Sequence, residues 1–140
     1  MSKKRILLLF VFSSMIAFSQ KNSEKFPVFP SCENSSLETL ENCFYNEVQS
    51  FVYANYKISS NLGPNYKGEV LVLFEVNDKG MFQVQYVDAN DEELIAESKR
   101  VFSLLPKIKP PTYNGKPTYS KYTIRIAIPL SIPVSNNITM

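Results

Sequence analysis

The sequence predicts an α+β fold in which two helices pack on a three-stranded antiparallel sheet. Three observations lead to this fold class. Two stretches carry apolar residues at three- and four-residue spacing, three stretches alternate apolar and polar residues, and their order along the chain is helix, hairpin, helix, strand. Short connections and right-handed crossovers favour placing the third strand beside the first and antiparallel to it. The expected strand order is therefore second, first, third (2-1-3).

The N-terminus has the pattern of a secretory signal peptide, residues 1–19. A basic run at residues 3–5 precedes an apolar stretch, and the small residues Ala17 and Ser19 precede Gln20. The apolar stretch is shorter than the ~20 residues that a membrane-spanning helix needs. We therefore expect cleavage before Gln20 and a soluble, exported protein, with an uncleaved membrane anchor as the alternative.

Cleavage would change the charge of the protein. The leader holds three of the 15 basic residues and none of the 13 acidic ones, so its removal lowers the formal net charge from +2 to −1. The basic excess belongs to the leader, and no nucleic-acid footprint remains. The rest of the chain has the length of one ordinary domain.

Histidine is absent from the sequence, which removes the commonest general base and metal ligand and every Ser-His or Cys-His nucleophile pair. A group of carboxylates, Asp88, Asp91, Glu92 and Glu93, could do acid–base chemistry. These residues crowd at an expected helix start, where negative charge is favoured for structural reasons. We expect no enzyme activity, no cofactor and no metal site.

The two cysteines, Cys32 and Cys43, are expected to form a structural disulfide. In an oxidising compartment an even pair usually bridges, and this short loop would stabilise the fold by about 3 kcal/mol on the chain-entropy estimate. A zinc site would need two more soft ligands, and a redox pair is more typically spaced Cys-x-x-Cys. The bridge would fasten an extended arm, residues 20–34, across the first helix.

The first helix is expected at residues 36–56. Ser35 and Glu38 have the spacing of a capping box. Apolar residues then follow on one face at three- and four-residue spacing: Leu37, Leu40, Phe44, Val48, Phe51 and Val52.

A β-hairpin follows, with its turn at residues 77–80, where Gly80 is expected to take positive φ. The alternation in both arms predicts one apolar face. The residues of that face are Val70, Val72, Phe74 and Val76 in the first strand and Phe82, Val84 and Tyr86, between Gln83 and Gln85, in the second.

The second helix is expected to be capped by Asn90 with Glu93 and to end at Pro106. Its buried face would hold Leu94, Ile95, Ser98, Val101, Phe102 and Leu105.

A proline-stiffened connector with a turn at Asn114–Gly115 leads to the third strand, Tyr119 to Ile128, which stops before Pro129. Residues 134–140 are expected to be a frayed tail. The third strand would lie at the edge of the sheet with its outer rim unpaired, and such an edge is either blunted or used.

Six pieces of this sequence, in order and spacing, resemble the C-terminal domain of TonB in the form common among energy-transducer proteins of Bacteroidetes. The resemblance covers residues 26–130 and gives a domain over residues 35–133. The pieces are "FPVFPSCE", Cys43-Phe44 in the first helix, "GEVLVLFEVNDKG", "LLPKIKP", "NGKP" and "YTIRIAIPL".

The resemblance implies a small periplasmic domain that binds the TonB box of an outer-membrane receptor by adding it as a strand beside its own last strand. It thereby links the protein to TonB-dependent transport across the outer membrane. Carried over to this chain, the binding edge is the last strand, and an ordinary solvent-facing role is an equal alternative for each residue. The candidate partner-binding residues are Tyr119, Lys121, Thr123, Arg125 and Ala127, and Arg125 could hold a carboxylate.

The chain also departs from the family pattern. Energy-transducing members have a membrane helix, often with a histidine, and a long proline-rich spacer, whereas a cleavable leader and a short arm are expected here. Ser31 stands where a glycine usually follows "FP". The alternative function is a structural or regulatory envelope domain that associates with itself or with another envelope protein through the same edge.

Overall fold

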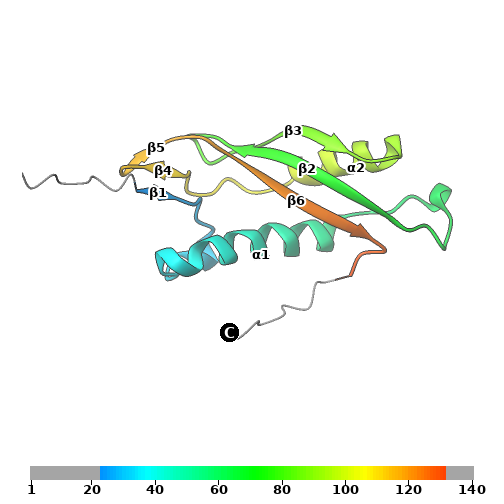
Figure 1. The fold of residues 1–140 in the computed structure, drawn as a ribbon, viewed down its shortest axis with the longest axis horizontal. Coiled ribbons are helices and arrows are strands. Elements are labelled where there is room, and N and C mark those ends of the chain that lie inside the picture. The colour runs from blue at the N-terminus through cyan, green and yellow to red at the C-terminus, as the bar shows by residue number, and fades with distance from the viewer. Residues whose placement is uncertain (1–22, 132–140) are drawn as a thin grey trace, which may run out of the picture.

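A computed structural model of the chain describes residues 23–131 (Figure 1). The expected signal peptide, residues 1–19, and the expected frayed tail, residues 134–140, lie outside the described residues. The elements are, in chain order, β1 (Glu24–Lys25), the 3-10 turn η1 (Pro30–Cys32), α1 (Leu37–Asn55), the 3-10 turn η2 (Ser60–Leu62), β2 (Gly68–Val76), β3 (Phe82–Asp88), α2 (Glu92–Ser103), β4 (Thr112–Tyr113), β5 (Lys116–Pro117) and β6 (Ser120–Ile128).

The main sheet has three antiparallel strands in the order β3-β2-β6, so β2 is central and β3 and β6 form its two edges. The β2–β3 turn at residues 77–80 has the expected form, with Gly80 at a φ of 78°. The α+β class, the two helices and an antiparallel three-stranded sheet agree with the sequence analysis.

Both helices pack on the same face of this sheet, and Phe74 of β2 lies between them. Its ring centroid is 6.4 Å from that of Phe44 on α1 and 5.0 Å from that of Phe102 on α2. Figure 1 shows α1 running along the sheet beneath β6. The alternate residues of β2 beginning with Val70 are fully buried on this face, as the alternation predicts. The opposite face of the sheet carries no helix of the described chain.

A second, smaller sheet in the order β1-β4-β5 lies at one end of the main sheet (Figure 1). This small sheet is not predictable from sequence periodicity, because β1, β4 and β5 are each only two residues long. The turn expected at Asn114–Gly115 does connect β4 to β5, and both residues have positive φ, 49° and 78°.

The segment expected to be an extended arm is built into the core. Phe26 lies against Tyr122 of β6, with centroids 5.4 Å apart, while Phe29 lies against Phe82 of β3 at 6.0 Å. The arm therefore crosses the sheet from one edge strand to the other. It then forms the 3-10 turn η1, which ends at Cys32.

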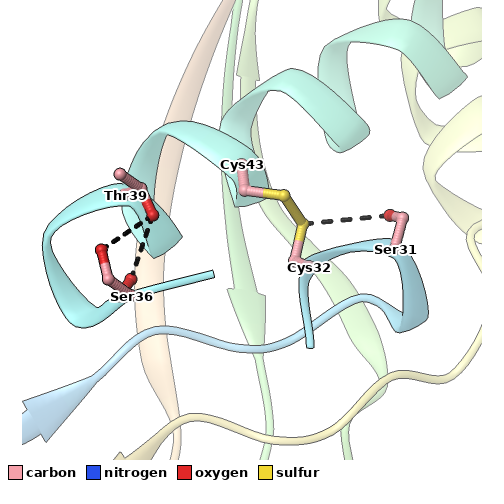
Figure 2. Close-up of a disulfide and its surroundings, with 5 residues drawn as sticks. All are labelled: Ser31, Cys32, Ser36, Thr39 and Cys43. Carbon is pink, nitrogen blue, oxygen red and sulfur yellow. Dashed lines mark hydrogen bonds between the residues drawn. A yellow bond between two sulfur atoms is a disulfide. The ribbon is translucent and has the colours of Figure 1, made fainter. Parts of the chain in front are cut away.

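The predicted disulfide is confirmed. Cys32 at the end of η1 is bonded to Cys43 on α1, with Cα atoms 5.9 Å apart (Figure 2). Cys32 is almost fully buried. The bridge therefore fastens the end of the arm to the second turn of the helix.

The predicted helix caps are wrong by one residue. Ser36, not Ser35, is the N-cap of α1. Its side chain makes no capping bond, and Thr39 donates instead to its carbonyl (Figure 2). The backbone N–H of Ser35 is used by the preceding turn, where it donates to the Cys32 carbonyl at 3.0 Å, so the helix starts later. In α2 the cap is Asp91 rather than Asn90, and its carboxylate accepts from the Glu93 N–H at 2.8 Å.

Two residues expected on apolar faces are exposed. Leu37 is 69% exposed, because it starts the first turn of α1, beyond the reach of the sheet. Tyr86 is 61% exposed because the β2–β3 ladder shifts register between Leu73 and Phe74. This bulge turns Tyr86 to the open face and places Val87 in the core instead.

Candidate functional site

The strand β6 forms the longest and most regular ladder of the structure. Its nine residues pair with all nine of β2 without a shift, from Ser120 opposite Val76 to Ile128 opposite Gly68. In an antiparallel ladder, alternate residues direct their N–H and C=O groups to the partner and the others direct them away. Every second residue of β6 therefore presents both backbone groups to the outer rim.

Nothing in residues 23–131 is paired with that outer rim. β6 pairs only with β2 in the described chain, and β1 of the arm pairs with β4. The arm contacts β6 through side chains: the Ser120 hydroxyl lies 3.4 Å from a carboxylate oxygen of Glu24, and the ring of Phe26 lies against that of Tyr122. The rim of β6 is thus open over its length within the described part of the chain.

The two faces of β6 differ sharply. Its helix-side residues are buried and hold the strand in place: Tyr122, Ile124, Ile126 and Ile128. Its open-face residues are all exposed, and they are the partner-binding residues predicted within the strand: Lys121, Thr123, Arg125 and Ala127. The structure brings these four together in one row. Tyr119, the fifth candidate, precedes the strand and is 64% exposed.

Arg125 already holds a carboxylate. Its Nη1 atom lies 2.6 Å from Oε1 of Glu69, across the ladder on β2. Both side chains are exposed to solvent, Arg125 at 66% and Glu69 at 50%. Exposed pairs of this kind contribute about 0–1 kcal/mol, so the guanidinium remains open to exchange with another carboxylate.

Half-buried aromatic rings flank the rim on its helix side, which the sequence analysis did not identify. Phe26 of the arm and Tyr45 of α1 lie 5.4 and 6.3 Å from Tyr122, between ring centroids. Burial raises the pKa of the Tyr122 hydroxyl well above its ordinary value, and that of Tyr45 in the same direction. These hydroxyls therefore stay neutral at physiological pH. The aromatic residues of the "FPVF" stretch were the signal for this cluster.

The other edge strand, β3, is less suited to pairing. Its ladder with β2 contains the bulge opposite Leu73 and Phe74, and bulges disrupt the regular spacing of backbone donors and acceptors. The strand itself is also shorter, seven residues against nine. The two rims of the sheet therefore differ, and β6 offers the more regular one.

A groove of about 550 Å³ lies beside the β2–β3 turn, between the arm and the connector. Its lining includes Asp78, Lys79 and Lys107, all exposed, together with Lys109, whose ammonium lies 3.0 Å from Glu33. Among residues 23–131, no group of three or more Asp, Glu, Cys or His side chains is placed to hold a metal ion. No helix in this part of the chain is both long and apolar enough to cross a membrane.

Comparisons with known proteins were made at three levels. Protein-family profiles, curated protein sequences and solved structures were each searched, and none of them gave a match to this chain.

Proposed function

We propose that this chain is a periplasmic binding module that takes up an extended segment of a partner protein as a further strand beside β6. We propose further that it is a TonB C-terminal-like domain and that the partner segment is the TonB box of an outer-membrane receptor. The protein would then take part in TonB-dependent transport. The observation that carries the proposal is the nine-residue outer rim of β6, which is unpaired within residues 23–131.

Strand addition uses the groups that this rim offers. A guest strand gains affinity from main-chain hydrogen bonds and specificity from the side chains that alternate along the edge. β6 is held from below by its buried residues and from the side by β2, so it requires little ordering when a guest binds. A preformed edge lowers the entropic cost of binding.

Two further observations support the envelope location and the resemblance. The Cys32–Cys43 bridge fits an oxidising compartment. The stretches "GEVLVLFEVNDKG" and "YTIRIAIPL", which carry much of the resemblance, form β2 with its turn and β6 with its end, so they lie side by side in the sheet. Mass spectrometry of the exported protein tests the location: a mature start at Gln20 is expected.

The binding proposal is tested by NMR titration of the isotope-labelled protein with TonB-box peptides from receptors of the same organism. Chemical shifts along residues 119–128 are expected to change. A matched peptide, N-methylated at every second residue on its pairing side, should bind much more weakly because it cannot form the ladder. Absence of shift changes in β6, or changes confined to β3, would refute the proposal.

A further inference from the structure

All charged side chains of β6 are basic. Lys121 and Arg125 are exposed on the open face, and the strand from Ser120 to Ile128 contains no Asp or Glu. The opposite edge strand, β3, is negatively charged, since it contains Asp88 and no basic residue. The rim proposed to bind a guest strand is therefore the positive rim of the sheet.

Acidic residues on the same face lie one strand further in. Glu75 on β2 is directly opposite Lys121, while Glu69 is opposite Ala127 and forms its ion pair diagonally with Arg125. A guest strand beside β6 would lie about 5 Å from β6 but about 10 Å from β2, which is comparable with the Debye length at 0.1 M salt. The guest strand therefore interacts strongly with the two basic side chains, which are close to it. Its interaction with the two acidic side chains is weakened by distance and by salt screening.

The spacing of the two basic residues sets a pattern for the guest. Lys121 and Arg125 are four residues apart on one face, about 13 Å along the strand. The guest residues opposite them must also be four apart. The guest residues opposite Tyr122 and Ile124 face the helix side, next to the half-buried ring of Tyr45.

We propose that the β6 rim selects an extended partner segment with carboxylates at positions i and i+4 on one face and apolar side chains at the alternate positions between them. This inference rests on the proposed function and adds the chemistry of the partner. The guest carboxylates pair with Lys121 and Arg125, and the apolar side chains extend the buried row that contains Tyr122. The pattern holds for either direction of the guest strand, because its two acidic positions are interchangeable.

A second copy of this chain fits the rim less well. Pairing of β6 with β6 of another copy would place two Lys121 and two Arg125 side chains on one face of the combined sheet, with no acidic residue from either strand. Like charges across a strand pair are destabilising. The protein is therefore expected to remain monomeric in sedimentation experiments, and a dimer formed through β6 would overturn the inference.

The inference is tested with three eight-residue peptides. Each has valine at every second position, and two positions four residues apart on the other face carry aspartate, asparagine or lysine. The aspartate peptide is expected to bind the protein roughly 2- to 30-fold more tightly than the asparagine peptide, from two opposite-charge cross-strand pairs. The lysine peptide should bind more weakly than either. The advantage of aspartate should largely vanish at about 1 M salt, where the Debye length is ~3 Å.

Two double variants locate the effect. Lys121→Gln with Arg125→Gln should remove the preference for aspartate, whereas Lys99→Gln with Lys107→Gln changes the net charge equally at exposed sites away from β6 and should keep it. In the single variant Glu69→Gln, the guanidinium of Arg125 loses its present ion-pair partner, so the preference for the aspartate peptide should increase. If all three peptides bind equally, the charge inference fails while strand addition stands. If none binds, both fail.

Discussion

The ring of Tyr122 on β6 lies 4.9 Å from the ring of Phe44 on α1, measured between centroids. Phe44 is fully buried, and it also lies against Phe74 on the central strand. The edge strand is thus anchored to the helix as well as to its neighbour β2. These contacts hold β6 in place although no strand of the described chain lies on its outer side.

Replacing Tyr122 should therefore cost stability. Tyr122→Ala is expected to lower the free energy of unfolding by about 3–5 kcal/mol, because it opens a cavity beneath Phe26 and Phe44. Thr123→Ala, on the exposed face of the same strand, should cost less than about 1 kcal/mol. Urea unfolding measures both, and equal losses would contradict the anchoring role.

The disulfide should stabilise the attachment of the arm. Cys32→Ala with Cys43→Ala is expected to lower the free energy of unfolding by about 3 kcal/mol, because the open chain regains loop entropy when unfolded. A reducing agent should destabilise the natural protein to a similar degree and leave the double variant unchanged. Urea curves with and without the reducing agent make the comparison, and identical midpoints in all four samples would disprove it.

Substitution by alanine should destabilise the protein to different degrees at two glycines that have the same φ angle. Gly80 and Gly115 both have a φ of 78°, so either substitution costs about 1–2 kcal/mol in backbone strain. A Cβ atom at Gly80 would also lie 1.7 Å from the carbonyl oxygen of Ile108, whereas at Gly115 it meets open space. Gly80→Ala should therefore be the more destabilising by several kcal/mol. Thermal unfolding of the two variants measures the difference, and similar losses would mean that the connector is not held against the turn.

The stability of the protein should fall in acid partly through Glu97. The Arg100 guanidinium donates to the Glu97 carboxylate, with Nε to Oε2 at 2.8 Å, and the Lys57 N–H donates at 2.7 Å, which lowers the pKa of Glu97 below its ordinary value. A group with a lowered folded-state pKa stabilises the fold above its unfolded pKa, about 4.3, and loses that contribution as the pH falls through the folded value.

Glu97→Gln should consequently flatten the decline in unfolding free energy below about pH 4.5, as measured by urea unfolding at several pH values. The exposed Glu41 on α1 provides a control, and Glu41→Gln should retain the slope of the natural protein. Equal slopes in both variants would show that the contacts of Glu97 do not affect folding.

The long periodic elements could be predicted from the sequence because burial decides them locally. The alternation of Tyr122, Ile124 and Ile126 with exposed residues fixes both faces of β6, and Asn114–Gly115 fixes a turn through positive φ. The disulfide followed from the cysteine count and the expected export. For the candidate site, the row from Lys121 to Ala127 was predicted as a set.

The missed features depend on contacts between distant residues. The bulge that turns Tyr86 outward comes from the pairing of β3 with β2, and a strand's own alternation does not reveal it. The small sheet depends on the pairing of Glu24 with Tyr113, 89 positions further along the chain. Its strands are too short to show a pattern in the sequence. The ring of Phe26 beside β6 likewise depends on the path of the arm, which composition alone does not determine.

Amide hydrogen exchange along β6, with and without a bound peptide, tests the open rim most directly. In the free protein, alternate amides from Ser120 to Ile128 should exchange slowly, where they bond to β2, and the amides between them should exchange fast. A saturating extended peptide should slow the fast set. Fast amides that stay fast with peptide bound, or a whole strand already slow without it, would contradict strand addition at β6.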